Sequence, residues 1–156
     1  MRNKSHNLLK HKFLLIVAGV LLSFTADAQC GLALKDVTLK EIGKVTYLKD
    51  FRVRLPEGKN PKKAPMKEFP ILLNKGTHYR FNVKADSSCT DQVILKLYDY
   101  TKYYGGNYDP DDGTSYEYFD FFCSKTQVYY LSMSFAEAKA GCAVTIVSFV
   151  DNYNTN

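Results

Sequence analysis

Residues 78–84 read HYRFNVK, and in this stretch every second side chain is apolar. Tyr79, Phe81 and Val83 alternate with polar residues, and successive side chains of a β-strand point to opposite faces. The stretch therefore predicts a strand with one face in a core and one face in water, as in an antiparallel sheet with a wet side.

The same period of two recurs along most of the chain. Strands are predicted over residues 45–55, 69–73, 78–84, 93–97, 116–123, 127–134 and 142–150. We also interpret residues 32–42 as a strand, and residues 135–141 could form one helical turn. Seven or eight strands with polar turns and no long amphipathic helix predict an all-β fold, an antiparallel β-sandwich of jelly-roll type.

Two stretches interrupt the alternation. Residues 56–65 contain three prolines and are predicted to form an exposed loop. Residues 99–115 are the least regular part of the chain. They form a predicted loop of about 17 residues, which exceeds the ~12 to 15 residues beyond which a loop is usually functional or disordered.

The N-terminus has the pattern of a secretory signal peptide. Basic residues precede an apolar run over residues 13–22, and a small-x-small pattern ends at Ala28. The run holds ten residues, whereas a membrane-spanning helix needs about 20. We therefore predict a signal peptide over residues 1–28, a single domain over residues 29–156 without a transmembrane segment, and a place in the periplasm or outside the cell.

Removal of residues 1–28 takes away four of the 21 basic residues and one of the 16 acidic residues. The remaining 128 residues carry a net charge of +2, from 17 basic and 15 acidic side chains. This balance does not favour nucleic acid or an anionic membrane surface as a partner. A chain of this length can bury a core without a metal, so no cofactor is required for folding.

All four cysteines, Cys30, Cys89, Cys123 and Cys142, lie after the predicted cleavage site. In an oxidising compartment an even number favours disulfides, and the spacing does not fit a zinc site. Four cysteines allow three pairings, which the sequence leaves open. We prefer Cys123 with Cys142 and Cys30 with Cys89, because the first pair closes the shortest loop. In a simple meander, however, Cys123 and Cys142 would lie at opposite ends.

Four strand motifs resemble a known bacterial family. They are YRFNV at residues 79–83, VILKLYD at 93–99, YFDF at 118–121 and VYYLSMS at 128–134. Their order resembles the bacterial pre-peptidase C-terminal domain over roughly residues 68–150. The resemblance implies a jelly-roll sandwich without catalytic residues, which serves secreted enzymes as an accessory or binding module. Disulfide-forming cysteines are not a hallmark of that family.

Seven of the 12 tyrosines fall in the segment from Tyr98 to Tyr118. A tyrosine has a flat apolar face and a polar tip, so the cluster could stack on a sugar ring or anchor a protein partner. Tyrosine is also a favoured strand residue, and several of these rings could instead cap the core. The candidate binding residues are Tyr100, Tyr103, Tyr104 and Tyr108.

Asp109, Asp111 and Asp112 lie beside Gly113 and place three carboxylates in one loop. Calcium prefers such oxygen ligands, although the loop lacks the EF-hand pattern. Asp and Gly are also frequent in ordinary turns. The sequence therefore leaves open a calcium site or a turn.

His78 is the only histidine after residue 28. Because it lies on the polar face of its strand without a second histidine, neither a Ser-His-Asp nor a Cys-His arrangement is supported. Glu117 and Asp120 could serve a glycosidase, but their odd spacing puts them on opposite faces of a strand.

These observations predict an exported β-sandwich with no enzymatic activity. It would act as a binding or structural accessory module of the cell envelope, with an unidentified protein or glycan as partner. Three alternatives stay open. They are a carbohydrate-binding module that uses the Tyr98–Tyr118 cluster, a calcium-stabilised accessory domain and, least favoured, a carboxylate-based hydrolase.

Overall fold

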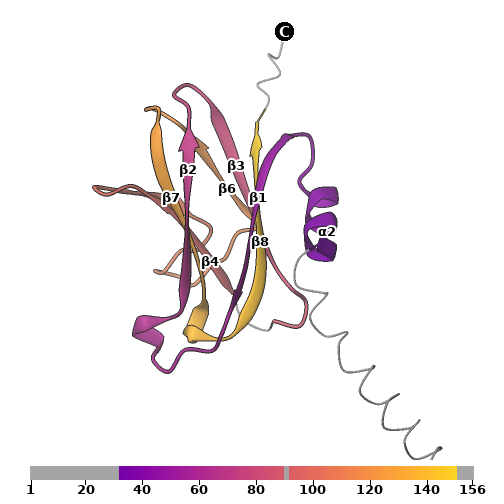
Figure 1. Cartoon of the computed structure of the whole chain (residues 1–156), viewed down its shortest axis with the longest axis vertical. Coiled ribbons are helices and arrows are strands. Elements are labelled where there is room, and N and C mark those ends of the chain that lie inside the picture. The colour runs from indigo at the N-terminus through magenta and orange to yellow at the C-terminus, as the bar shows by residue number, and fades with distance from the viewer. Residues whose placement is uncertain (1–31, 90–91, 151–156) are drawn as a thin grey trace, which may run out of the picture.

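The computed structural model describes residues 32–89 and 92–150, which form two four-stranded antiparallel sheets packed face to face (Figure 1). The strands are β1 (Thr46–Leu55), β2 (Met66–Leu73), β3 (His78–Ala85), β4 (Val93–Tyr98), β5 (Tyr103–Gly106), β6 (Tyr118–Phe122), β7 (Gln127–Phe135) and β8 (Gly141–Phe149). The helical elements are α2 (Leu34–Glu41) and the 3₁₀ turns η3 (Pro61–Lys63) and η4 (Ala136–Ala138). The predicted all-β sandwich and the predicted helical turn before the last strand are confirmed.

The strand order is that of a jelly roll. The first sheet has the order β1-β8-β3-β6 and the second sheet the order β2-β7-β4-β5. Every connection except that between β4 and β5 therefore crosses from one sheet to the other. Such crossing between two packed sheets is the double-sheet arrangement that the turn-rich, alternating sequence predicts.

The apolar residues of the alternating stretch 78–84 are buried, as the sequence predicts. Tyr79, Phe81 and Val83 lie in the core between the sheets, and the ring of Phe81 stacks on that of Phe119 with centroids 4.8 Å apart. The polar residues of this stretch were expected to face water, but Asn82 is only 9% exposed. Helix α2 forms part of the wall of a small cavity over Asn82 and shields its side chain from solvent.

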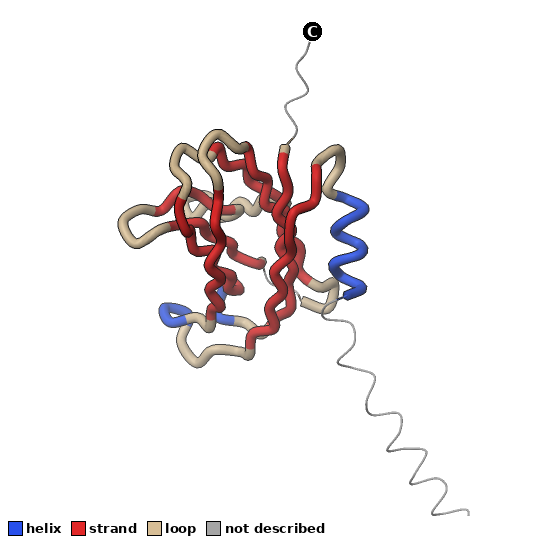
Figure 2. Tube along the Cα trace, turned by 45° about the horizontal axis from the view of Figure 1, so that its top comes forward, coloured by secondary structure: helices blue, strands red, loops and turns tan. Residues whose placement is uncertain are grey.

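Residues 32–42 form a helix where the sequence led us to expect a strand, so that interpretation is wrong. Leu34, Thr38 and Ile42 are buried, and their spacing of four residues is the repeat of one helix face. This face packs on Val144 and Ile146 of β8. Helix α2 therefore lies on the outer side of the first sheet (Figure 2), and β8 is buried on both faces.

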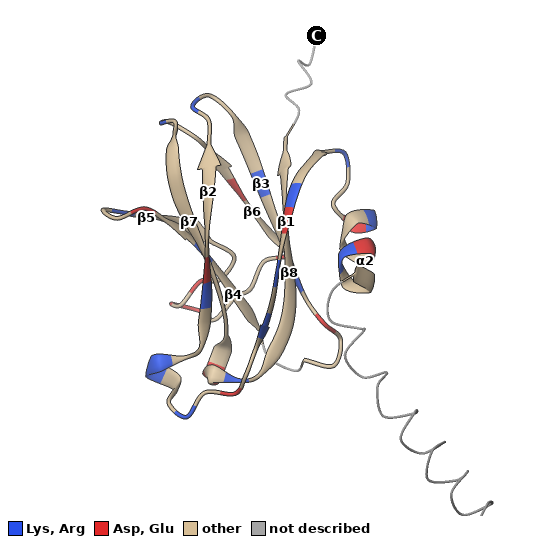
Figure 3. Ribbon diagram, in the orientation of Figure 1, with Lys and Arg blue, Asp and Glu red and all other residues tan. Residues whose placement is uncertain are grey.

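Ion pairs also join α2 to the first sheet. Lys35 Nζ lies 2.7 Å from Asp50 Oδ1 on β1, and Lys84 Nζ on β3 lies 2.5 Å from Glu41 Oε2. Figure 3 shows basic and acidic residues interspersed over the helix, the strands and the loops. The helix is thus held by an apolar face with charged pairs at its margins.

The segment 99–115 is more regular than predicted, because it contains β5 and an isolated bridge between Tyr108 and Ser115. Asp99 closes the turn before β5, where its Oδ1 accepts hydrogen bonds from the backbone N–H groups of Thr101 (2.7 Å) and Lys102 (2.8 Å). An aspartate that bonds to the backbone two residues ahead is a common turn device.

Asn107 holds the other end of β5. Its side chain is 2% exposed, accepts a hydrogen bond from the Leu95 N–H (2.7 Å) and donates one to the Val93 carbonyl (3.0 Å). Gly106 lets the backbones approach, because a Cβ at this position would lie 2.1 Å from the Leu95 carbonyl oxygen. Local sequence periodicity does not report such side-chain-to-backbone contacts.

The cysteines do not form the pairs that we preferred from the sequence. Cys89 and Cys123, one from each preferred pair, are free. Cys30 belongs to the residues that are not described. Cys123 is buried in the core between the sheets, whereas Cys142 packs beneath α2 on the outer side of the first sheet. The sheet therefore separates the two side chains that the shortest-loop argument joined.

The predicted signal peptide over residues 1–28 lies outside the described residues. Within residues 32–89 and 92–150, no helix is long and apolar enough to cross a membrane.

Candidate ligand-binding groove

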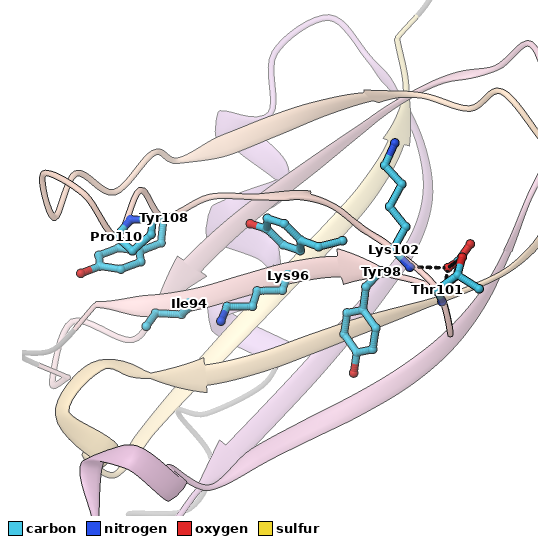
Figure 4. A pocket seen from close by; sticks show the side chains of 9 residues that line it. Ile94, Lys96, Tyr98, Thr101, Lys102, Tyr108 and Pro110 are labelled. Carbon is cyan, nitrogen blue, oxygen red and sulfur yellow. Dashed lines mark hydrogen bonds between the residues drawn. The ribbon is translucent and has the colours of Figure 1, made fainter.

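A groove of about 570 Å³ lies on the outer face of the second sheet (Figure 4). Strand β4, the turn after it, β5 and the following loop contribute its walls. The lining residues are Ile94, Lys96, Tyr98, Asp99, Thr101, Lys102, Tyr103, Tyr108 and Pro110. Aliphatic and aromatic side chains with a few polar groups are the usual composition of a small-molecule site.

Tyr98 and Tyr103 form the centre of the groove, because they are paired across β4 and β5. The inward positions of β4, such as Leu97, are filled by the core, so Tyr98 faces outward. Its hydroxyl donates a hydrogen bond to the Glu68 carboxylate on β2. Burial, together with this bond, raises the pKa of Tyr98 to about 12. Tyr98 is therefore a neutral hydrogen-bond donor with a fixed ring at neutral pH.

Tyr103 presents a more open ring, with 54% of the residue exposed. Partial burial, and secondarily the charge of Asp109, raises the pKa of its phenol. The ring of Tyr108 and the Pro110 ring lie at the far end of the same groove (Figure 4). A flat ligand placed here would meet aromatic faces from both β5 and the following loop.

Tyr130 of β7 extends the aromatic surface beyond the groove. Its ring centroid lies 6.1 Å from that of Tyr98 and 5.0 Å from that of Tyr100, whose ring it meets edge to face. The hydroxyls of Tyr100 and Tyr130 are hydrogen-bonded to each other. Tyr100 is 88% exposed, so the pair holds a ring in solvent that would otherwise rotate freely.

The structure separates the four tyrosines that the sequence grouped. Tyr103 and Tyr108 line the groove, and Tyr100 stands beside it on Tyr130. Tyr104 points to the other side of β5, where its ring packs against Phe121 at 5.5 Å. Tyr104 is therefore a residue of the core margin and is not part of the groove.

Tyr104 nevertheless shapes the site through Asp99. Its hydroxyl donates to Asp99 Oδ2 (2.7 Å), and the Gln127 amide donates to the same oxygen (2.7 Å). Hydrogen bonds from Tyr104 and Thr101 stabilise the ionised carboxylate and hold the pKa of Asp99 well below its usual range. The groove's own carboxylate is therefore ionised and used to hold the turn.

Sequence reasoning did not select two tyrosines of this surface as candidate binding residues. Tyr98 lines the groove, and Tyr130 lies beside Tyr98 outside the groove. Tyr130 occurs in the VYYLSMS strand, where Tyr129 occupies an inward position. The alternation implies that Tyr130 faces outward. The alternation therefore shows on which face of the sheet Tyr130 lies. Only the pairing of β7 with β4 shows that Tyr98 is its neighbour.

Tyr118 belongs to a different surface. It lies on β6 in the first sheet, where the Arg80 guanidinium is 4.0 Å from the centroid of its ring. Arg80 also makes a two-pronged ion pair with Asp120, with both N–O distances 2.7 Å, and His78 Nε2 lies 3.6 Å from Asp120 Oδ2. Arg80 lowers the pKa of Asp120. His78 is thus a member of a surface ion cluster on the sheet opposite the groove.

The acidic loop uses its carboxylates to shape turns. Asp109 Oδ1 accepts a hydrogen bond from the Asp111 N–H (2.9 Å), and Asp112 Oδ1 accepts one from the Thr114 N–H (2.8 Å). Among the residues that the structure describes, no three His, Cys, Asp or Glu side chains gather as a set that could hold a metal ion. A calcium site at Asp109, Asp111 and Asp112 stays a prediction from the sequence.

The chain resembles a domain of known structure. No family model matches the chain, and no curated protein matches it. The pre-peptidase C-terminal domain of collagenase from Bacillus anthracis matches with a TM-score of 0.46 and 12% sequence identity, over 65% of this chain and 89% of that chain. This is the domain family that the strand motifs resemble.

Proposed function

We propose that this protein is an exported, non-catalytic binding module that holds a glycan on the tyrosine groove of its second sheet. The observation that supports this proposal best is the groove itself. Tyr98, Tyr103 and Tyr108 surround about 570 Å³ of open space. Aromatic faces suit the C–H faces of a sugar ring, and the polar groups at the margin suit its hydroxyls.

The fixed rings support a binding role. Tyr98 is held by Glu68 and Tyr100 is held by Tyr130 through hydroxyl hydrogen bonds. A side chain that is already ordered loses little conformational entropy when a ligand binds, and this loss otherwise costs roughly 0.5–1.5 kcal/mol per side chain. A weakly bound ligand such as a sugar benefits most from such preorganisation.

The polar groups of the groove favour binding over catalysis. Asp99 is the carboxylate among the lining residues, and its oxygens accept hydrogen bonds from Thr101, Tyr104 and Gln127. A hydrolase with two carboxylates needs both groups free to face the scissile bond. Export is a further part of the proposal and is supported by the signal-peptide pattern of residues 1–28.

A protein partner is the second candidate, and one observation favours it. Leu72 of β2 and Val128 of β7 are directly opposite each other, and they are 61% and 46% exposed. An exposed aliphatic pair beside aromatic rings is typical of a protein interface more than of a sugar site. The test below separates the two candidates.

The test is a thermal-shift screen of the purified protein against soluble oligosaccharides, because a ligand that binds only the native state raises the melting temperature. A glycan that raises it for the wild type should fail to do so for Tyr103→Ala. Tyr118→Ala removes an exposed tyrosine from the first sheet and should bind like the wild type. If no glycan shifts the wild type, the glycan proposal fails. If Leu72→Asp then abolishes capture of an envelope protein, the second candidate replaces it.

A further inference from the structure

The tyrosine groove contains a positive charge that has no counterion within the protein. Lys96 lies on β4 between Ile94 and Tyr98 and lines the groove (Figure 4). Its side chain is exposed, because it alternates with the buried residues Leu95 and Leu97. Among residues 32–89 and 92–150, no carboxylate forms an ion pair with Lys96. The ammonium is therefore open to a ligand in the groove.

The strands on either side of Lys96 leave its side chain uncovered. Lys96 is directly opposite Gly106 on β5 and Ser132 on β7. Glycine has no side chain, and that of serine is short and uncharged. Lys96 can therefore be approached from above the sheet without displacing a neighbouring side chain.

The hydroxyl of Tyr103 lies beside the same cross-strand pair. A Cβ on Gly106, the partner of Lys96, would be only 3.0 Å from the Tyr103 hydroxyl oxygen. Within the part of the chain that the structure describes, this hydroxyl makes no hydrogen bond. Partial burial and the charge of Asp109 raise the pKa of Tyr103, so the phenol keeps its proton at neutral pH. The groove thus contains a second donor close to Lys96.

The other charged groups of this surface are already engaged. Three carboxylates lie in or beside the groove, those of Glu68, Asp99 and Asp109, and each accepts hydrogen bonds from the protein itself. The second lysine of the lining, Lys102, places its Nζ 5.3 Å from the centroid of the Tyr104 ring. The groups left for a ligand are therefore donors, and one of them is charged.

We infer that the ligand of the tyrosine groove is an acidic sugar whose carboxylate is bound by the Lys96 ammonium and the Tyr103 hydroxyl. This inference rests on the proposed glycan-binding function and narrows the ligand to oligosaccharides of uronic acids. A carboxylate accepts a charge-assisted hydrogen bond from an ammonium group, which a neutral hydroxyl cannot replace. The rings of Tyr98 and Tyr108 remain available to the C–H faces of the sugar.

The experiment is isothermal titration of the purified protein with a panel of oligouronates. Each oligouronate is compared with its carboxyl-reduced counterpart, which has the same ring stereochemistry but no charge. At least one oligouronate should bind roughly tenfold more tightly than its neutral counterpart, the effect of one charge-assisted hydrogen bond. Added sodium chloride should reduce this preference, because salt screens an exposed ion pair.

Two variants locate the source of the preference. Lys96→Gln should bind the oligouronate roughly tenfold more weakly than the wild type and bind the neutral counterpart like the wild type. Lys40→Gln removes the same charge from the last turn of α2, on the outer side of the first sheet. It should keep the wild-type preference, because the sandwich lies between Lys40 and the groove.

The outcomes separate this inference from the proposed function. The inference is overturned if neutral glycans bind as tightly as the oligouronates, or if Lys96→Gln keeps the preference for the acidic sugar. Glycan binding itself would stand in both cases. If neither the oligouronates nor any neutral glycan binds, the proposed function fails and the inference fails with it.

Discussion

Tyr130 of β7 lies directly opposite Tyr98 of β4, and the centroids of their rings are 6.1 Å apart. Tyr98 in turn pairs with Tyr103 of β5, and Tyr130 pairs with Pro70 of β2. A row of ring-bearing residues therefore crosses all four strands of the second sheet. A ligand that follows this row would contact residues that are far apart in the sequence.

Replacement of Tyr130 by alanine should weaken glycan binding although Tyr130 is not among the groove's lining residues. The change removes the ring that supports Tyr98 and Tyr100. Aromatic pairs contribute about 1 kcal/mol, which corresponds to roughly fivefold in affinity. Isothermal titration with the glycan found in the screen measures the effect. Tyr130→Phe keeps the ring and should stay close to the wild type, and equal loss in both variants would point to the hydroxyl instead.

Replacement of Asn107 by alanine should lower the free energy of unfolding by about 1–3 kcal/mol, because the Leu95 N–H and the Val93 carbonyl lose a buried partner. Urea denaturation measures this loss. Asn74 is exposed in the turn between β2 and β3, and Asn74→Ala should change stability by less than about 0.5 kcal/mol. If the two variants are equally stable, Asn107 does not organise β5 as described.

Replacement of Leu34 by alanine should destabilise the attachment of α2. Leu34 is 8% exposed and packs on β8, whereas Leu32 is 67% exposed. Truncation of a buried leucine costs about 2–5 kcal/mol, with the lower end expected at the margin of a core. Leu32→Ala is the matched control and should have little effect in the same urea titration. A similar small change in both variants would show that the helix contributes little to stability.

Replacement of Asp99 by asparagine should lower the melting temperature at neutral pH. Hydrogen bonds from Tyr104 and Thr101 hold the pKa of Asp99 below its usual range in the folded state. A carboxyl group with a lowered folded pKa stabilises the fold above its unfolded pKa, about 3.9, and this stabilisation is lost as the pH falls toward the folded value.

The difference in melting temperature between the wild type and Asp99→Asn should therefore be constant near neutral pH and shrink below about pH 4. Thermal melts followed by circular dichroism across this range measure it. Asp111→Asn, which alters a carboxylate of the loop after β5, is the control. A difference that stays constant down to the lowest pH would contradict the assigned role of the Asp99 charge.

Periodicity alone predicts most of the fold. The alternation of Tyr79, Phe81 and Val83 identifies the buried face of β3, because the direction of a strand side chain depends only on its own position along the strand. The same local rule indicates that Tyr98 and Tyr130 face away from the core. Helix α2 was not predicted, because its buried face consists of Leu34, Thr38 and Ile42. The threonine is polar, so a search for apolar residues at helical spacing does not detect this face.

The sequence by itself determined an all-β sandwich and a concentration of tyrosines between residues 98 and 118. Tertiary structure alone decided which tyrosines share a surface, since Tyr104 turns into the core margin while Tyr130 joins from another strand. It also decided that Cys142 lies beside Cys89 and not beside Cys123. The reason is that neighbours across a sheet depend on the pairing and register of strands that are distant in the sequence. The alternation within one strand does not show which strand it pairs with.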